Sequence, residues 1–289
     1  MAGSSDSAKM LLEFLPYIQE HRGRTFVIKL GGSAMSKSDC LADVATDVVL
    51  LQHVGIRPVV VHGGGPEISD YMKRLDIEPR FVNGLRVTDE DTLSVAQMVL
   101  IGLTGKRIVT AIHQAGGSAI GLSGIDAGLL MAEKMQRGDC EVDLGCVGEV
   151  YHVRTDVFDQ LLDGGYIPVI APLAADTAGQ HYNVNADHVA GQIATAIRAA
   201  KLLNMTDVAG FMRDPKDPST LVSLMALTEA KEALASPAAQ AGMLPKLESC
   251  VQAVEGGVER AHLIDGRVPH ALLIELFTDG GIGTMVTAH

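Results

Sequence analysis

Short apolar runs that end in glycine constrain the fold of this chain more than any other feature. Residues 27–30 (Val-Ile-Lys-Leu) lead into Gly31 and Gly32, and residues 59–62 (Val-Val-Val-His) lead into three more glycines. The runs lack the alternation of apolar and polar residues expected of a strand with one face in water, and segments of helical spacing separate them. This pattern predicts an α/β fold, a three-layer αβα sandwich with a mostly parallel central sheet.

The glycine-rich ends of these runs are suited to bind phosphate. Glycine lets backbone N–H groups approach an anion closely, and the N-terminus of a following helix adds partial positive charge. Residues 63–65 and 121–124 (Gly-Leu-Ser-Gly) share this character, and Lys29 adds a point charge that can follow a phosphoryl group. Because ligands of parallel sheets bind beyond the carboxyl ends of the strands, we predict the site there. The sequence contains neither a Walker A loop nor a Rossmann GxGxxG motif.

The bulk composition narrows the class of protein. A chain of 289 residues is long enough for one large α/β domain or for two lobes that share a sheet. The formal net charge of -12 argues against nucleic-acid binding, because such a chain is repelled by the phosphate backbone. Four scattered cysteines, without CxxC spacing, favour reduced thiols over a disulfide framework or a zinc site.

The N-terminal region predicts a cytoplasmic protein that begins with a helix. The first ten residues lack the basic and apolar regions of a secretory signal, and no apolar run approaches the roughly 18–20 residues of a membrane span. Residues 8–21 have apolar side chains at helical spacing, and Gly23 follows as a stop. Because this helix precedes the first core strand, it either contacts a partner or packs on its own subunit.

Several polar residues near helix starts are candidates for the site, although each also has a structural interpretation. Arg86 suits bidentate carboxylate binding, with a surface salt bridge as the alternative. Thr88, with Asp91 three residues later, is a plausible helix N-cap. Asn185 or Asp187 could simply cap the helix that follows them.

Taken together, these segments resemble the amino acid kinase family, from about Leu11 to the C-terminus. The resemblance implies the carbamate kinase-like fold of that family, with an N-terminal helical extension at 1–23 and a kinase domain at 24–289. Within the domain, about 24–180 would form an N-lobe with the amino-acid substrate and the dimer contacts, and about 181–289 a nucleotide-binding C-lobe. The most specific matches are residues 28–32, 61–66, 83–88, 183–187, 206–210, 242–246 and 264–270.

The pattern is most similar to that of family members that phosphorylate the γ-carboxylate of N-acetyl-L-glutamate in arginine biosynthesis. These members use ATP, with Mg²⁺ carried by the nucleotide, and transfer the phosphoryl group in line without a covalent intermediate. The resemblance implies that Lys29 and Lys246 neutralise charge on the migrating group and that Asp187 holds both lysines. It further implies that Gly64, Gly65, Arg86 and Asn183 bind the amino-acid substrate, and that Gly31, Gly32, Thr206, Asp207 and Gly210 bind ATP.

Assembly and regulation also follow only from the resemblance. The N-terminal helix, with Pro16 and Tyr17, is similar to the extension of hexameric, arginine-inhibited members. This implies a homodimer or a hexamer built as a trimer of dimers. The candidate arginine-binding residues are Tyr17, His270, Glu275 and Gly281.

Two segments depart from the family pattern, at residues 102–106 and 124–127, and both lie in the amino-acid-binding half. They concern the substrate pocket and not the lysine pair. One alternative is another kinase of this fold, acting on N-succinylglutamate, glutamate, aspartate or UMP. The segments 83–88 and 264–270 argue against glutamate, aspartate and UMP kinases. The other is a non-catalytic, arginine-sensing module, which would be expected to lack the lysine pair.

Overall fold

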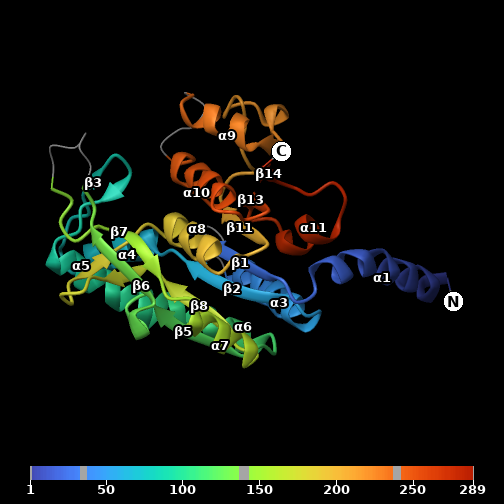
Figure 1. Cartoon of the computed structure of the whole chain (residues 1–289), viewed down its shortest axis with the longest axis horizontal. Coiled ribbons are helices and arrows are strands. Elements are labelled where there is room, and N and C mark those ends of the chain that lie inside the picture. The colour runs from blue at the N-terminus through green and yellow to red at the C-terminus, as the bar shows by residue number, and fades with distance from the viewer. Residues whose placement is uncertain (1, 33–37, 137–142, 237–241, 289) are drawn as a thin grey trace.

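The computed structural model describes residues 2–32, 38–136, 143–236 and 242–288, and an eight-stranded sheet runs through its centre (Figure 1). The strand order is β12-β14-β13-β11-β1-β2-β8-β5, and every neighbouring pair is parallel except β13 with β14. The mostly parallel sheet predicted from the sequence is confirmed. The strands are β1 (Thr25–Leu30), β2 (Arg57–His62), β5 (Ala119–Ser123), β8 (Ile167–Ala171), β11 (Lys201–Thr206), β12 (Leu224–Ala226), β13 (Arg260–Asp265) and β14 (Thr284–Thr287).

Each face of this sheet has its own hydrophobic core. Successive side chains of a strand point to opposite faces, so Val27 and Val59 lie in one core while Ile28 and Val60 lie in the other. Both sets are fully buried, which explains why the strands read as continuous apolar runs. The first face is covered by α7 (Asp156–Asp163), α8 (Ala186–Ala196), α9 (Leu227–Leu234) and α10 (Leu244–Glu255), and the second by α1 (Ala2–His21), α3 (Ser38–His53), α6 (Gly105–Gln114) and α11 (Ala271–Phe277).

A smaller four-stranded sheet and a hairpin lie beside the main sheet. The small sheet has the order β10-β9-β6-β7, with β6 (Leu130–Lys134), β7 (Gly148–Val153), β9 (Leu173–Ala175) and β10 (His181–Asn183). The hairpin pairs β3 (Phe81–Val82) with β4 (Leu85–Arg86). For this region the sequence predicts only a β-like segment at 139–153. Strand β7 confirms the second part of that segment. Residues 139–142 lie outside the described ranges. Strands of two or three residues carry too little pattern to be recognised.

One long helix replaces two predicted ones. The spacing predicted separate helices at 88–101 and 106–114, but α5 (Glu90–Gln97), the π-helical η1 (Met98–Thr104) and α6 run on without a break. Val99 and Ile108 are both buried, so the tertiary contacts outweigh the helix-breaking tendency of Gly102 and Gly105. The combined stretch, Glu90–Gln114, is long and apolar enough to cross a membrane by length and composition. In this fold Leu93, Val99 and Ile108 on this stretch are buried in hydrophobic clusters.

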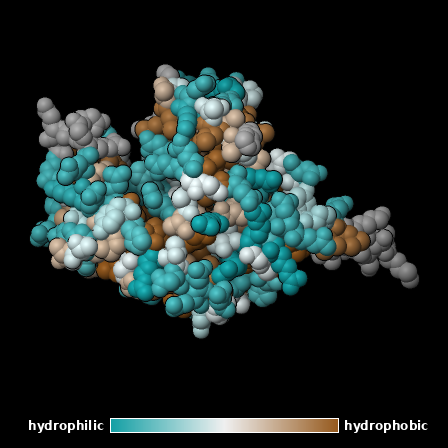
Figure 2. Space-filling view, in the orientation of Figure 1, coloured by the Kyte–Doolittle hydropathy of each residue, from teal (hydrophilic) through white to brown (hydrophobic). Residues whose placement is uncertain are grey.

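Helix α1 begins earlier than predicted, at Ala2 rather than at residue 8, and extends away from the body of the molecule (Figure 1). Its C-terminal half packs on α11, where the rings of Phe14 and Tyr17 meet Phe277 edge to face at centroid distances of 5.9 and 6.4 Å. Leu12 and Leu15 stay exposed, and hydrophobic colour marks this part of α1 in Figure 2. Helix α1 therefore packs on its own subunit and also presents an apolar surface.

Candidate active site

A buried ion pair between Lys29 and Asp187 lies at the carboxyl end of the central strand. Lys29 comes from β1, Asp187 from the first turn of α8, and Nζ and Oδ1 are 2.7 Å apart. Burial alone would raise the pKa of the Asp187 carboxyl, but the charges of Lys29 and then Lys246 prevail and lower it. Asn185 rather than Asp187 caps α8, because its Oδ1 accepts from the N–H groups of Asp187 and His188. The carboxylate is thus free to hold a lysine.

Lys246 approaches the same carboxylate from α10. It lies in the first turn of that helix, and its Nζ donates to the carbonyl oxygen of Gly242 at 2.8 Å. Ser249, one turn further on, donates from Oγ to the backbone oxygen of Asp187 at 2.6 Å. This hydrogen bond joins α10 to α8 and so places Lys246 relative to Asp187.

The glycines of the first two loops have different roles. The N–H of Gly31 donates to Met205 O at 3.1 Å, and a Cβ at Gly31 would lie 2.6 Å from that oxygen. Gly31 therefore allows two strands to approach closely. Gly64 and Gly65 begin α4 (Gly65–Arg74), where the first N–H groups of a helix have no acceptor within it. These N–H groups are available to an anion.

The third glycine-rich loop, residues 121–124, does not belong to the site. Residues 121–123 lie inside β5, and a Cβ at Gly124 would lie 2.1 Å from Leu173 O. Asp126 accepts hydrogen bonds from the N–H and the hydroxyl of Ser123. The prediction of a phosphate cradle here was wrong, because Gly121 lies within a strand and Gly124 packs against the backbone of β9.

Arg86 is held by neutral groups. Its Nη2 donates to Gly65 O and to Ser69 Oγ, both at 2.8 Å, and its guanidinium lies 4.7 Å from the centre of the Phe81 ring. Burial lowers the pKa of Arg86, yet a guanidinium stays charged at neutral pH. Its contacts within the described part of the chain include no carboxylate, which rules out the surface salt bridge considered from the sequence. A buried cation of this kind needs an anion, and a ligand can supply one.

These residues line one cavity of about 330 Å³. Asn183, at the end of β10, donates from Nδ2 to the hydroxyl of Thr88 at 3.3 Å. Thr88 itself is buried and caps no helix: Asp89 caps α5 by accepting from the N–H of Thr92. The predicted Thr88 cap was therefore wrong by one residue. The lining includes Lys29, Gly31, Gly32, Gly64, Gly65, Arg86, Asn183, Asp187 and Lys246.

A second cavity, of about 380 Å³, lies on the other side of Lys246. Thr206 and Asp207 at the end of β11, together with Gly210, form its polar side. Phe211, Met212 and Met243 add apolar surface that sequence reasoning missed, since nothing in their spacing marks them. Lys246 lines both cavities and is therefore placed to contact a ligand in either of them.

The comparisons with known proteins identify the family. Residues 24–265 match the model of the amino acid kinase family. The chain belongs to this family. It is also 52% identical to the acetylglutamate kinase of Thermosynechococcus vestitus, over 99% of this chain and 96% of that one. The acetylglutamate kinase of Symbiobacterium thermophilum is 52% identical as well, over 97% of each chain.

Solved structures agree with the fold of this amino acid kinase. The N-acetylglutamate synthase of Neisseria gonorrhoeae, complexed with coenzyme A and N-acetyl-glutamate, superposes with a TM-score of 0.87 at 29% identity. That alignment covers 98% of this chain and 63% of the synthase. The carbamate kinase of Giardia lamblia bound to AMP-PNP has a TM-score of 0.69 at 14% identity, covering 92% of this chain and 99% of that one. The predicted carbamate kinase-like fold is confirmed.

The amino acid kinase has a third cavity, of about 230 Å³, between α1 and the C-terminal part of the chain. Three of the four candidate arginine residues, Tyr17, Glu275 and Gly281, line it. The fourth does not: His270 Nδ1 lies 2.6 Å from Oδ1 of Asp47 on α3. Sequence reasoning missed the other charged lining residues, Glu20, Lys201, Arg260, His262 and Asp279.

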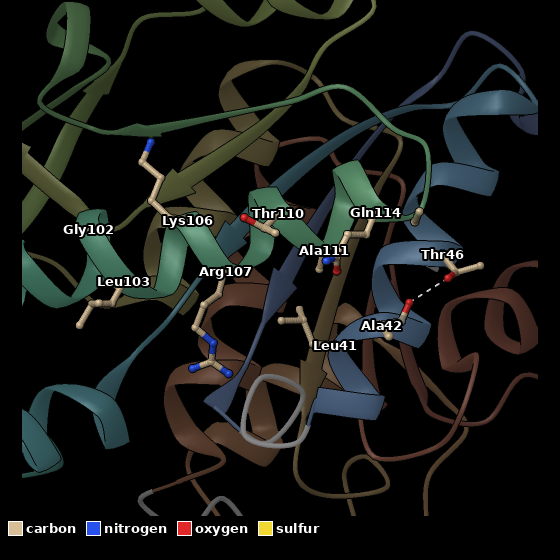
Figure 3. A pocket seen from close by; sticks show the side chains of 11 residues that line it. Leu41, Ala42, Thr46, Gly102, Leu103, Lys106, Arg107, Thr110, Ala111 and Gln114 are labelled. Atoms are coloured by element: carbon tan, nitrogen blue, oxygen red, sulfur yellow. Dashed lines mark hydrogen bonds between the residues drawn. The ribbon is translucent and has the colours of Figure 1, made fainter.

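A further cavity, of about 580 Å³, is larger than these three and lies between α3 and α6 (Figure 3). Lys106 and Arg107 extend in different directions from α6 in this view. On α3, the hydroxyl of Thr46 donates a hydrogen bond to the backbone oxygen of Ala42. None of the residues that the sequence singled out for catalysis lines it. The largest of these four cavities is therefore not the one that holds the candidate catalytic residues.

Proposed function

We propose that this chain phosphorylates the γ-carboxylate of N-acetyl-L-glutamate with ATP, giving N-acetyl-L-glutamyl 5-phosphate for arginine biosynthesis. The relatives that are 52% identical over nearly their whole length are named acetylglutamate kinase, which supports this substrate. The observation that carries the proposal is the position of Lys246, which lines both cavities and acts on the carboxylate that holds Lys29.

The two lysines are suited to direct phosphoryl transfer. Such a reaction needs positioning and neutralisation of negative charge more than covalent help. Lys29 is oriented by Asp187, and Lys246 is delivered by the first turn of α10. The acceptor carboxylate is already ionised at neutral pH, so no general base is required. Asp187 accordingly acts by holding ammonium groups.

The two cavities divide the reactants between them. Arg86 and Asn183 offer a cation and an amide for the polar groups of the amino-acid substrate. The second cavity, with Thr206, Asp207 and Gly210, would hold the nucleotide. Bound ATP supplies the phosphoryl group, and its Mg²⁺ neutralises phosphate charge.

An ADP-release assay tests this function. Purified enzyme with MgATP should turn over N-acetylglutamate far faster than N-succinylglutamate, glutamate, aspartate or UMP. The variant Lys246→Ala should lose the activity, and Lys134→Ala, which alters an exposed ion pair, should keep it. Turnover with only UMP or free glutamate would contradict the substrate, and ATP binding without any turnover would favour the non-catalytic module.

We also propose that arginine inhibits the enzyme by binding in the third cavity, as part of a cytoplasmic dimer or hexamer. The cavity combines the carboxylates of Glu20, Glu275 and Asp279 with the ammonium of Lys201, which matches the two ends of an amino acid with a cationic side chain. The exposed Leu12 and Leu15 of α1 support an assembly through this helix.

Inhibition and assembly can be measured separately. Arginine titrated into the assay should lower the rate, and Lys201→Met should weaken this response while activity without arginine remains. An unchanged rate at millimolar arginine would remove the regulatory proposal. Light scattering of the purified chain should give a dimer or a hexamer, and a monomer would contradict the assembly.

A further inference from the structure

We infer that Thr88 is a positioning residue that fixes the amide of Asn183 for the amino-acid substrate, an inference that rests on the function proposed above. Its side chain is fully buried, between two residues of the substrate cavity. The hydroxyl lies 3.0 Å from the backbone oxygen of Arg86 and 3.3 Å from Nδ2 of Asn183. Thr88 itself does not line the cavity, so it acts through its neighbours.

The two hydrogen bonds of the Thr88 hydroxyl determine the orientation of the Asn183 side-chain amide. A hydroxyl has one proton, and the carbonyl oxygen of Arg86 can only accept it. Toward Asn183 the same hydroxyl can therefore only accept, and it selects the NH₂ side of that amide. The reverse orientation would bring two oxygens together without a proton. The carbonyl oxygen of Asn183 is thus left to accept from a ligand, and Arg86 offers donors from another wall of the cavity.

The backbone fixes the position of Asn183 but not this orientation. The N–H of Thr88 donates to Leu144 O, the N–H of Cys146 donates to Thr88 O, and the N–H of Asn183 donates to Cys146 O. Gly145 permits this approach, since its φ is +72° and a Cβ there would lie 2.3 Å from Thr88 O. Three distant segments are joined in this way. The remaining freedom is rotation of the Asn183 amide, which the Thr88 hydroxyl removes.

The variants Thr88→Val and Thr88→Ser test the inference. Valine keeps the shape and removes the hydroxyl, so KM for N-acetylglutamate should rise about tenfold or more, because a buried amide loses its partner. KM for ATP and kcat should stay within about twofold of wild type. Serine restores the hydroxyl and should restore KM. Thr88→Ala is a second hydroxyl-free variant, used if the valine variant does not fold.

A double-mutant cycle separates positioning from general damage. If Thr88 acts through Asn183, Thr88→Val should add nothing to the KM effect of Asn183→Ala. Thr284→Val is the matched control, because Thr284 is equally buried and bridges Val222 O and Phe211 N away from the substrate cavity. It should lower thermal stability and leave KM for N-acetylglutamate unchanged.

Additive effects, an unchanged KM in Thr88→Val, or a serine variant as impaired as the valine variant would each overturn the inference. A wild-type chain that fails to use N-acetylglutamate would contradict the proposed function itself. The two failures are therefore distinguishable in one set of assays.

Discussion

At the scale of single residues, the two lysines differ in how strongly the fold depends on them. Lys29 and Asp187 are both almost completely buried, so each needs the charge of the other. Lys246 is only partly buried, and its direct hydrogen bond is to a backbone oxygen. Removing Lys29 leaves the Asp187 carboxylate in the interior without its ion-pair partner, whereas removing Lys246 leaves the Lys29–Asp187 pair intact.

We therefore expect Lys29→Met and Lys246→Ala to have the same effect on catalysis and different effects on stability. Each should lower kcat by about 100-fold or more, as the loss of one preorganised donor does. Only Lys29→Met should also lower the free energy of unfolding, by about 3 kcal/mol. Urea unfolding of both variants beside steady-state assays measures this. Equal stabilities of the two variants would contradict the role of the buried pair.

The candidate residues could be found from the sequence because they lie in segments shared with the family. The residues that these candidates contact could not be found from the sequence, because such contacts join distant positions. His270 and Asp47, for example, are 223 positions apart. The Thr88 cap was misassigned because Asp89, the next residue, competes for the same helix start. Local patterns suggest which residues carry chemistry, and the fold decides which of them meet.

At the scale of elements, the long helix Glu90–Gln114 packs against the second glycine loop at Gly64. A Cβ at Gly64 would lie 2.6 Å from Cδ2 of Leu100, which belongs to the π-helical segment η1. A Cβ at the next glycine, Gly65, would have no neighbouring atom within 4 Å. Both glycines were predicted to bind substrate, but only at Gly64 would an added Cβ collide with another element.

This contrast gives a prediction for Gly64→Ala and Gly65→Ala. The first should destabilise the fold by about 1–3 kcal/mol, because it overpacks the contact with Leu100. The second should change the stability by less than about 0.5 kcal/mol. Combining Gly64→Ala with Leu100→Ala should cost less than the two single variants added together. Strict additivity in thermal unfolding would show that Leu100 is not the cause.

The main strands and most helices were predictable because each is buried on a strongly periodic or fully apolar face. The hairpin β3–β4 and most of the small sheet were not, because the pairing of these strands depends on contacts with distant segments. The sequence also did not predict that α5 and α6 are continuous through η1, because this continuity depends on tertiary contacts. Burial against the core stabilises a π-helical turn that its glycines alone would disfavour.

At the scale of the whole molecule, buried histidines make stability depend on pH. Burial lowers the pKa of His62 to about 4, against about 6.5 in an unfolded chain. Below pH 6.5 the unfolded chain therefore binds a proton that the folded chain does not, and stability falls as the pH drops toward 4. Burial raises the pKa of Asp47 to about 6, which works in the opposite direction between pH 6 and 3.8.

We expect the free energy of unfolding to fall by up to about 3 kcal/mol between pH 6.5 and 4 on account of His62. Urea titrations at half-unit pH steps measure the slope of the free energy of unfolding against pH. This slope is compared between variants because a substitution can also shift the absolute stability. His62→Asn should show a slope smaller by about one proton over this interval. An identical slope in the variant would show that His62 titrates normally in the folded state.

The central position of β1 has a consequence for how the chain is made. One edge of β1 pairs with β2 and the other with β11, which begins only at Lys201. A nascent chain that has emerged as far as β8 can complete the β5-β8-β2-β1 half of the sheet, but it leaves an open hydrogen-bonding edge on β1. Ribosome-bound or truncated chains that stop before residue 201 should therefore self-associate or recruit chaperones until the second half is synthesised.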